Sequence, residues 1–507
     1  MIRDFTAPFK RLRAALRRPP PCPLPPCPLP PPDLTCPILH PDVPLPAWVA
    51  QDPVVQKYRA LLGDLPWHQF PERRTDRPFP GPKPDPRAPF AAAFLVKLHE
   101  DKRFMSDLRT YLVEHPALVY WLGFPRLSDP TAPHGFDCAA SVPKRRHFSS
   151  VLRSLPNAAL QFLLDATVQS LQATLPPDQQ ATFGDTIAGD TQALLAWVAE
   201  NNPKQYIKAG RLDKTRQPTG DPDCKLGVKK SRNSAPADAD GSDQPTPATD
   251  ATPARRLQVG VEIFWGYASG VVATRLPDGT EVVLAERTRP FNESDPSYFH
   301  PLMAMVEARL GRKPRYGTWD AAYDAHYVHD YFHQAGGFAA VPFNPGKKGA
   351  DRTFAPDGTP LCAAQLPMTI QFTYQHRSGL IPHLREKYRC PLLFPSATGA
   401  SCPLADPHWA KGGCTTTIAA GAGARLRHTL DRDGAAYKDL YALRTMVERI
   451  NSQAEALDSI HPKLRSHRAI ANRNTLTYVL INLRALSRLR SAAREARPAT
   501  ESVTLAA

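Results

Sequence analysis

Apolar residues recur with helical spacing through the first third of the chain. Between Trp48 and Leu175 the clearest amphipathic runs are LVEHPALVYWLG and VLRSLPNAALQFLLDATVQSLQATL, in which apolar side chains return every three or four positions. This pattern predicts an all-α N-terminal domain over residues 48–175. Residues 1–47 are basic and proline-rich, and because proline removes a backbone donor and fixes φ, we expect them to be disordered, like the tail 491–507.

The period of the pattern changes near residue 256. The runs LQVGVEIFWGYASGVVATRL and TEVVLAERT flank Asp278-Gly279, which predicts two antiparallel strands joined at an Asp-Gly turn. Within the first run, we expect Trp265 and Tyr267 to lie in the core of the sheet rather than to act as platforms on which nucleic-acid bases stack.

Strands and helices alternate in the remainder of the ordered chain. We expect a helix over about 298–309 that ends at Gly311, then the strand RYGTWD, the helix AHYVHDYFHQA and the strand FAAVPF. Two further helices follow, over about 436–457 and 468–490. Hairpin strands first and strand–helix alternation afterwards predict a mixed α/β layer fold over 176–490.

Two segments interrupt this α/β domain. Residues 229–256 are rich in Ala, Asp, Pro, Ser and Thr and cannot form a core, so we expect a disordered, exposed loop. Residues 346–435 have no clear period and are expected to form an irregular insertion. The insertion contains four cysteines: Cys362, Cys390, Cys402 and Cys414. Four thiols could bind a structural Zn²⁺ ion, but the insertion lacks a CxxC pair, so we expect buried free cysteines and no zinc.

The chain is basic, with 63 Lys and Arg against 48 Asp and Glu and a formal net charge of +15. The positive charge is concentrated in residues 1–18 and 449–497, and such clusters gain affinity for polyanions by releasing counterions. Nucleic acid is therefore the leading partner class, with tails that only improve solubility as the alternative. No apolar run approaches the roughly 18 residues of a membrane span, no signal-peptide pattern is present, and the nine cysteines are an odd number. These features exclude a secreted disulfide scaffold and favour a cytoplasmic protein without a membrane span.

Three acids stand out by position. Asp320 falls at the carboxyl end of the strand RYGTWD, where open α/β sheets place their ligands. Glu448 shares one helical face with Tyr441 and Arg444, and Asp190 follows a short apolar run. Three carboxylates that converge from separate elements would suit two Mg²⁺ ions, which activate a water or a 3′-hydroxyl for attack on a phosphodiester.

Each acid also has a purely structural interpretation. Asp190 precedes TQALLAWVAE and could cap a helix. Asp320 could cap the turn into the next helix, although Asp324 suits that position better. Glu448 could form an ordinary ion pair with Arg444 one turn away. The pattern alone leaves these alternatives open.

The segments DTQALLAWV, FWGY, DAAYDA and YALRTMVERINSQAEAL resemble those of DDE-type transposases of bacterial insertion sequences. The resemblance runs from about Asn157 to Arg488. DAAYDA is similar to the second-aspartate motif of the family and implies a metal-ligand role for Asp320. YALRTMVER matches the tyrosine–arginine–glutamate signature and implies the same role for Glu448.

The family also implies a first aspartate, a fold and a cofactor. The first aspartate is carried over to Asp190, with Asp185 close by as the alternative. The implied fold is an RNase H-like mixed sheet flanked by helices, with 346–435 as a subdomain inserted before the glutamate helix. Asp190, Asp320 and Glu448 would be the catalytic residues and would hold two Mg²⁺ ions, for which Mn²⁺ can substitute.

The activity that the resemblance implies is transposition. The enzyme would bind the ends of an insertion sequence, cleave their phosphodiester bonds and join the 3′-hydroxyl ends to target DNA. Its partners would be double-stranded DNA, as terminal inverted repeats and target, and a second copy of the chain, in the nucleoid-associated part of the bacterial cytoplasm. By elimination, the helical region 48–175 would recognise the repeats. The residues implied to contact DNA are Tyr441, Arg444, Arg449, Lys463 and Arg465.

One departure from the family pattern bears on activity. The signature normally ends with a lysine two helical turns after the glutamate, where this chain has Glu455. A glutamate repels phosphate, so either Lys463 supplies the missing charge or the chain cleaves DNA poorly. The alternatives to an active transposase are a decayed copy that only binds DNA and a related metal-dependent nuclease that does not join strands.

Overall fold

The computed structural model describes residues 36–73, 85–202, 210–235, 256–344, 353–377 and 381–495. Residues 1–35 and 496–507, both predicted to be disordered, lie outside these ranges. Residues 36–47 are folded, with Cys36 buried against Gly123, so the predicted disorder is wrong there. Residues 491–495 likewise continue the last helix. No helix in the described part of the chain is long and apolar enough to cross a membrane.

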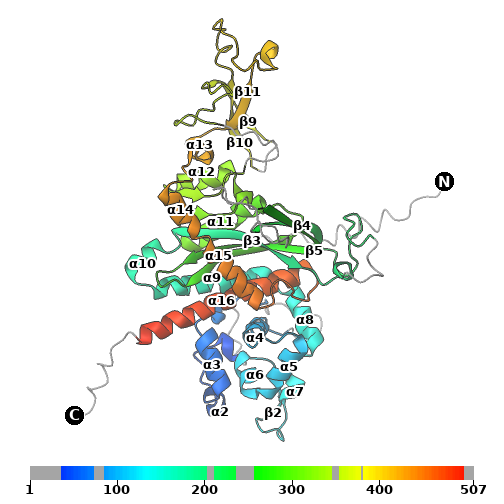
Figure 1. Ribbon diagram of the computed structural model, residues 1–507. Coiled ribbons are helices and arrows are strands. Elements are labelled where there is room, and N and C mark those ends of the chain that lie inside the picture. Colours follow the sequence, from blue (N-terminus) through cyan, green and yellow to red (C-terminus); the bar gives the residue numbers. More distant parts are fainter. Residues whose placement is uncertain are drawn as a thin grey trace, which may run out of the picture.

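A mixed sheet of six strands forms the centre of the molecule (Figure 1). The strands are β3 (Thr186–Leu195), β4 (Lys225–Ala235), β5 (Arg256–Arg275), β6 (Glu281–Pro290), β7 (Tyr316–Thr318) and β8 (Phe338–Ala340). Their order is β4-β5-β3-β7-β8, and β6 also pairs with β5. β3, β7 and β8 run parallel to one another, whereas β5 is antiparallel to β3, β4 and β6. The predicted mixed α/β fold is confirmed at this level.

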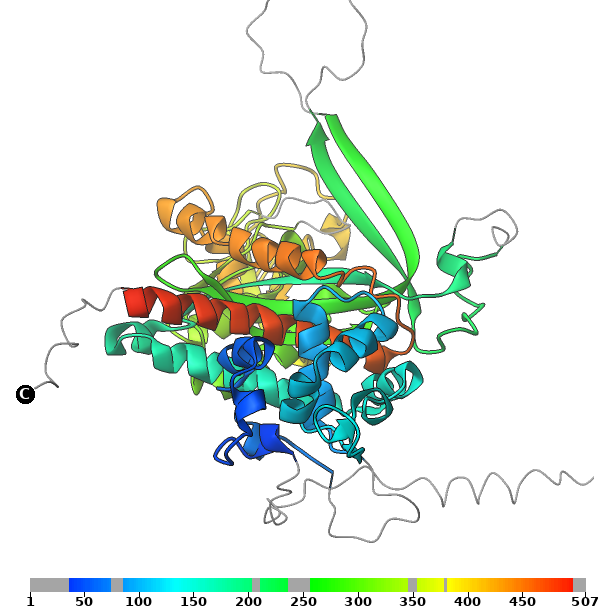
Figure 2. The same cartoon turned by 90° about the horizontal axis from the view of Figure 1, so that it is seen from below.

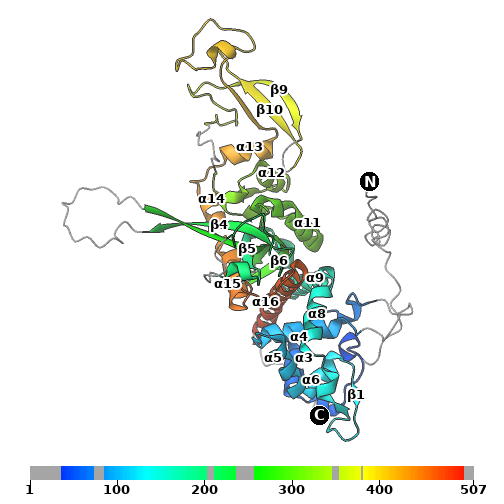
Figure 3. The ribbon, with the colours of Figure 1, turned by 90° about the vertical axis from the view of Figure 1, so that its right-hand side faces the viewer.

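The hairpin predicted at Asp278-Gly279 is present. Gly279 has a φ of +87°, the left-handed conformation that a glycine adopts readily, in the turn between β5 and β6. The first half of β5 pairs with β4 as a two-stranded ribbon that projects from the body (Figures 2 and 3). Residues 229–235 are therefore strand, contrary to the predicted loop, because pairing with β5 supplies hydrogen bonds that composition does not reveal. Residues 236–255 lie outside the described ranges.

Helices cover both faces of the sheet. Val271 and Ala273 of β5 belong to one apolar cluster with α15 (Thr445–Ala456) and α16 (His467–Glu495). Val272 belongs to a second cluster, with α11 (Phe299–Leu310) and α12 (His326–Gln334). Since successive side chains of a strand point to opposite faces, the consecutive buried residues Val271, Val272 and Ala273 of β5 reflect burial on both sides. Trp265 and Tyr267 are buried in the sheet core as predicted.

The N-terminal region is a helical bundle. Its helices are α2 (Ala47–Ala50), α3 (Pro53–Leu62), α4 (Ala88–His99), α5 (Met105–Glu114), α6 (Pro116–Leu122), α7 (Cys138–Ser141), α8 (Arg145–Ser154), α9 (Asn157–Thr174) and α10 (Pro177–Thr182). The helical prediction is confirmed except for a two-residue pairing of β1 (Leu127–Ser128) with β2 (Phe136–Asp137). α4 is apolar on all sides and buried from Ala88 to Leu98, as a central helix must be. α16 packs on α9, α8, α4 and α3 and so joins the bundle to the sheet.

The insertion is more regular than predicted. It contains an antiparallel sheet of β9 (Thr369–His376), β10 (His383–Arg389) and β11 (Thr415–Ala419), followed by α13 (Ala422–Thr429), which packs on α12. Much of the surface of these strands is exposed and most of their residues are polar, so the alternation of apolar and polar residues that predicts a strand is weak. All described cysteines are free. Only Cys390 of the four in the insertion is fully buried, and burial raises the pKa of the Cys414 thiol to about 12.

Candidate carboxylate site beside the parallel strands

Asp190 lies in the middle of β3, where it pairs with Val271 of β5. The helix-cap interpretation is therefore wrong, because the residues after Asp190 continue the strand. Its side chain points toward α15. Asn451 donates a hydrogen bond from Nδ2 to Oδ2 of Asp190 at 3.0 Å, and Nη2 of Arg444 lies 3.8 Å from Oδ1.

Asp320 lies next to Asp190 because of the register of two parallel strands. Ala188 of β3 pairs with Thr318, the last residue of β7, and each acid follows two residues later: Asp190 within β3 and Asp320 just beyond the end of β7. Asp320 also accepts a hydrogen bond from the Ala322 amide at 3.0 Å, so its capping role is confirmed as well. The same carboxylate can cap this turn and still act as a ligand, since each of its oxygens has two lone pairs.

Asp324, the second acid of DAAYDA, faces away from this site. It is buried and accepts hydrogen bonds from His329 and from the Asn344 amide, and Arg427 of α13 forms an ion pair with it at 2.9 Å. Burial alone would raise its pKa, but His329 and Arg427 outweigh burial and hold the pKa below its usual value. Asp324 therefore fixes α13, and with it the insertion, to the sheet domain.

Glu448 and Arg444 reach the site from a broken helix. The helix predicted over 436–457 is in fact two, α14 (Ala435–Ala442) and α15, and Arg444 stands at the junction as the residue that precedes α15. Nη1 of Arg444 lies 2.5 Å from Oε1 of Glu448, so the predicted ion pair is confirmed. The same guanidinium faces Asp190. Arg444 is thus held between carboxylates from two elements.

The electrostatics of these side chains are coupled. Burial raises the pKa of Asp190 to about 6; the charge of Arg444 opposes this effect, and the charges of Asp320 and Glu448 add to it. Burial also raises the pKa of Asp320, again against Arg444. Burial raises the pKa of Tyr441 as well. The charge of Arg444 opposes this shift, and the charges of Asp320 and Glu448 add to it. The five groups therefore share one electrostatic environment.

Asp295 is a fourth carboxylate that sequence reasoning missed. It opens the short helix η5 (Asp295–Tyr298) that follows β6. Burial raises its pKa to about 6, and the charges of Asp320 and Asp190 contribute to the shift. Its segment, NESDPSYF, has the composition of an ordinary turn, so only the folding of β6 beside β5 brings Asp295 toward the other acids.

The remaining candidate residues lie elsewhere. Asp185 precedes β3, at the end of the strand remote from this site, and forms an ion pair with Arg312. Arg449 is next to Glu448 in sequence but pairs with Glu281 of β6 at 2.5 Å. Lys463 and Arg465 lie in the loop between α15 and α16. Arg465 donates a hydrogen bond to the backbone carbonyl of Trp197 at 2.9 Å.

The oxygen ligands at this site are of the kind that a divalent ion prefers, but in this structure the acidic side chains are too far apart to hold one. Carboxylate and amide oxygens are the ligands that Mg²⁺ prefers. Within the described ranges, however, no three His, Cys, Asp or Glu side chains are grouped closely enough to hold a metal ion. The positive charge between Asp190 and Glu448 is instead that of Arg444.

Comparisons of this chain with known protein families, with curated proteins and with solved structures find no match.

Proposed function

We propose that this chain is a DDE-type insertion-sequence transposase whose sheet domain has the RNase H-like fold. The observation that carries the proposal is the approach of Asp190, Asp320 and Glu448 from two parallel strands and a helix, in the order that the family motifs require. The raised pKa of Asp190, to which the other two acids contribute, supports a cluster of negative charge. Acids with perturbed pKa values concentrate at functional sites.

Arg444 is the residue through which the site would respond to DNA. Its guanidinium now pairs with Asp190 and Glu448. A phosphodiester offers the same bidentate geometry as a carboxylate, so an incoming phosphate would compete for Arg444 and release both acids. Tyr441, which stacks against Tyr437 with ring centroids 5.9 Å apart, would limit where the Arg444 side chain can move. Two Mg²⁺ ions bound by the released carboxylates would supply the activation of the attacking water or 3′-hydroxyl.

The proposed partners are the terminal inverted repeats, target DNA and a second copy of the chain. Lys463 and Arg465 are better placed than Arg449 to contact DNA, because Arg449 is already paired with Glu281. Glu455 is exposed on α15, where it would face DNA as a repulsive charge. This last feature favours the second candidate function, a decayed copy that only binds DNA.

A strand-transfer assay separates these functions. The purified protein is incubated with Mg²⁺ and a labelled duplex that contains the inverted repeats flanking the coding region. The proposal predicts cleaved and joined products, both lost in Glu448→Gln and both retained in Glu455→Gln. The second variant is the matched control, because it removes the same charge from the same helix two turns away. Cleavage without joining would indicate a nuclease, and binding without either product would indicate a decayed copy.

A further inference from the structure

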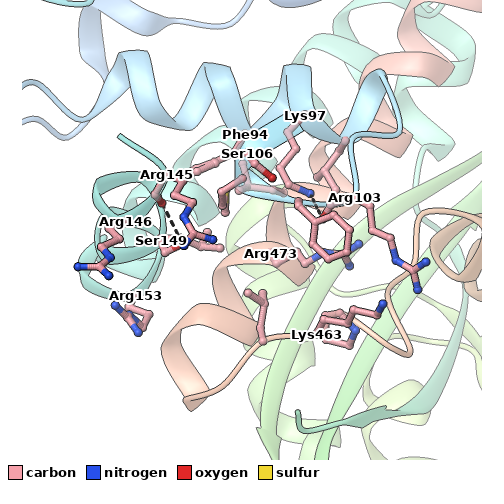
Figure 4. Close-up of a pocket in the computed structure, with 17 residues that line it drawn as sticks. Phe94, Lys97, Arg103, Ser106, Arg145, Arg146, Ser149, Arg153, Lys463 and Arg473 are labelled. Atoms are coloured by element: carbon pink, nitrogen blue, oxygen red, sulfur yellow. Dashed lines mark hydrogen bonds between the residues drawn. The ribbon is translucent and has the colours of Figure 1, made fainter. Parts of the chain in front are cut away.

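A cavity of about 570 Å³ lies between the helical bundle and the loop that joins α15 to α16 (Figure 4), and none of Asp190, Asp320 and Glu448 lines it. Seven of its lining residues are Lys or Arg, and no described Asp or Glu lines it. Its floor is apolar and includes Phe94, Leu152 and Leu476. A cavity with a cationic rim and an apolar floor attracts ligands that have both a negative charge and a flat apolar part.

Two of the seven cations have structural roles. Lys97 donates hydrogen bonds to the backbone carbonyls of Lys102 and Arg103 and so holds the turn after α4. Arg473 of α16 donates to the carbonyl of Leu457 at 2.5 Å. These hydrogen bonds account for the two side chains, because they satisfy backbone carbonyls in the turn after α4 and at the end of α15.

The other five cations have no such explanation. They are Arg103, Arg145, Arg146, Arg153 and Lys463, and none of them forms an ion pair with a described residue. Three come from α8, on one side of the cavity, and Arg103 and Lys463 face them from the other side (Figure 4). Like charges that face one another across a cavity repel, so a bound anion would stabilise this arrangement.

Exposed aromatic rings accompany the cations. Phe104 is 51% exposed and Trp197 is 52% exposed. The ammonium group of Lys463 lies over both rings, 5.4 Å from the centroid of Phe104 and 5.6 Å from that of Trp197. Aromatic faces beside a cationic groove are the means by which proteins stack unpaired bases.

We propose that this cavity is a binding site for single-stranded nucleic acid. Phosphates would contact the arginines of α8 together with Arg103, and bases would stack on Phe104 and Trp197. An unpaired strand is favoured over a duplex because the bases of a duplex stack on one another and offer only their edges. The site is separate from the carboxylates and requires no metal, so it does not rest on the proposed transposase activity.

Fluorescence anisotropy on the full-length chain tests the site. A labelled single-stranded DNA of mixed sequence is titrated in EDTA, with an RNA of the same sequence and the DNA duplex as competitors. Loss of one stacked base should weaken binding about fivefold or more, so Phe104→Ala and Trp197→Ala should each have this effect. Phe372→Ala is the matched control, because Phe372 is 47% exposed on β9 and also lies under a lysine, Lys387. This control should bind like the wild type.

The arginines are tested by salt dependence. Replacing Arg145, Arg146 and Arg153 together by Gln should lower the slope of log affinity against log salt by about 2, since each phosphate contact on a single strand contributes about 0.7. Lys214, Lys411 and Lys438 are exposed on other surfaces, and their replacement by Gln makes the same change in net charge. The proposal is overturned if both triple variants behave alike, if Phe104→Ala and Phe372→Ala bind equally, or if Phe104→Ala and Trp197→Ala weaken duplex binding as much as single-strand binding. An RNA that competes better than the DNA would retain the site and assign it to RNA.

Discussion

The mostly buried carboxylate of Asp190, whose side chain is 20% exposed, should contribute less stability at neutral pH than at mildly acidic pH. Its pKa is about 6 in the folded chain, compared with about 4 for an unperturbed aspartate. Below pH 4 the group is protonated in both states and has no effect. Above pH 6 it is ionised in both states, and the folded state carries the full cost of the buried charge, about 3 kcal/mol.

Asp190→Asn removes this cost with little change of shape. The Asn451 amide can still donate to the new side-chain oxygen, which replaces its present acceptor. We expect the variant to be more stable than the wild type by up to about 3 kcal/mol at pH 8 and by only about 1 kcal/mol at pH 4.5. Such a gain is expected on replacing a residue of the proposed active site, because stability and activity often oppose each other.

Urea unfolding followed by tryptophan fluorescence at the two pH values measures the difference, provided that the slopes agree. Asp185→Asn is the matched control, because Asp185 directly precedes the same strand and forms an ion pair with Arg312. It should give no gain at pH 8. The reasoning is refuted if Asp190→Asn is no more stable than the wild type at pH 8, or if its gain is the same at both pH values.

Three further outcomes follow from the same geometry. Arg444→Gln removes the cation held between the carboxylates, so Mn²⁺, detected by electron paramagnetic resonance, should bind this variant more tightly than the wild type; equal affinity would contradict the exchange of arginine for metal. Gly189→Ala should lower the free energy of unfolding by about 1–3 kcal/mol, because a Cβ would stand 1.9 Å from the ring of Trp319. Gly220→Ala is the control and should be tolerated, because the nearest atoms there are 3.8 Å away. Because the pKa of Asp324 is low, the ionised carboxylate stabilises the fold above about pH 4, and this stabilisation is lost as the group is protonated at lower pH. Limited proteolysis should therefore release the insertion at acidic pH. In Asp324→Ala it should do so already at neutral pH.

The sequence predicted most helices and the central hairpin because their patterns are periodic, and glycine marked the end of α11 and the turn of the hairpin. It left Asp190 ambiguous for a physical reason: a short apolar run fits a strand or a helix equally well, and only the neighbouring strands β5 and β7 decide between them. The polar strands of the insertion were missed because exposed strands lack strong alternation.

The candidate site was predicted in part. Asp320, Glu448 and Arg444 were proposed from local motifs, since each motif is a short continuous segment of the chain. Asp295 and the break before α15 depend on contacts between elements far apart in sequence, and no local pattern encodes them. The cationic cavity was not predicted at all, because its residues come from α4, α5, α8, α16 and two loops. Its arginines are scattered along the sequence and become a cluster only on folding.

The last helix gives this cavity a fixed relation to the sheet. α16 is 29 residues long, about 43 Å, and is continuous in structure (Figure 1). Arg473 and Leu476 line the cavity, and between them Asn474 and Thr475 hydrogen-bond to the buried Glu286 of β6. A nucleic-acid strand bound against this helix would therefore lie at a fixed position relative to β6, because both are contacted by the same helical turn. Because α16 is continuous, the distance from that strand to the acidic residues of the sheet domain would be fixed.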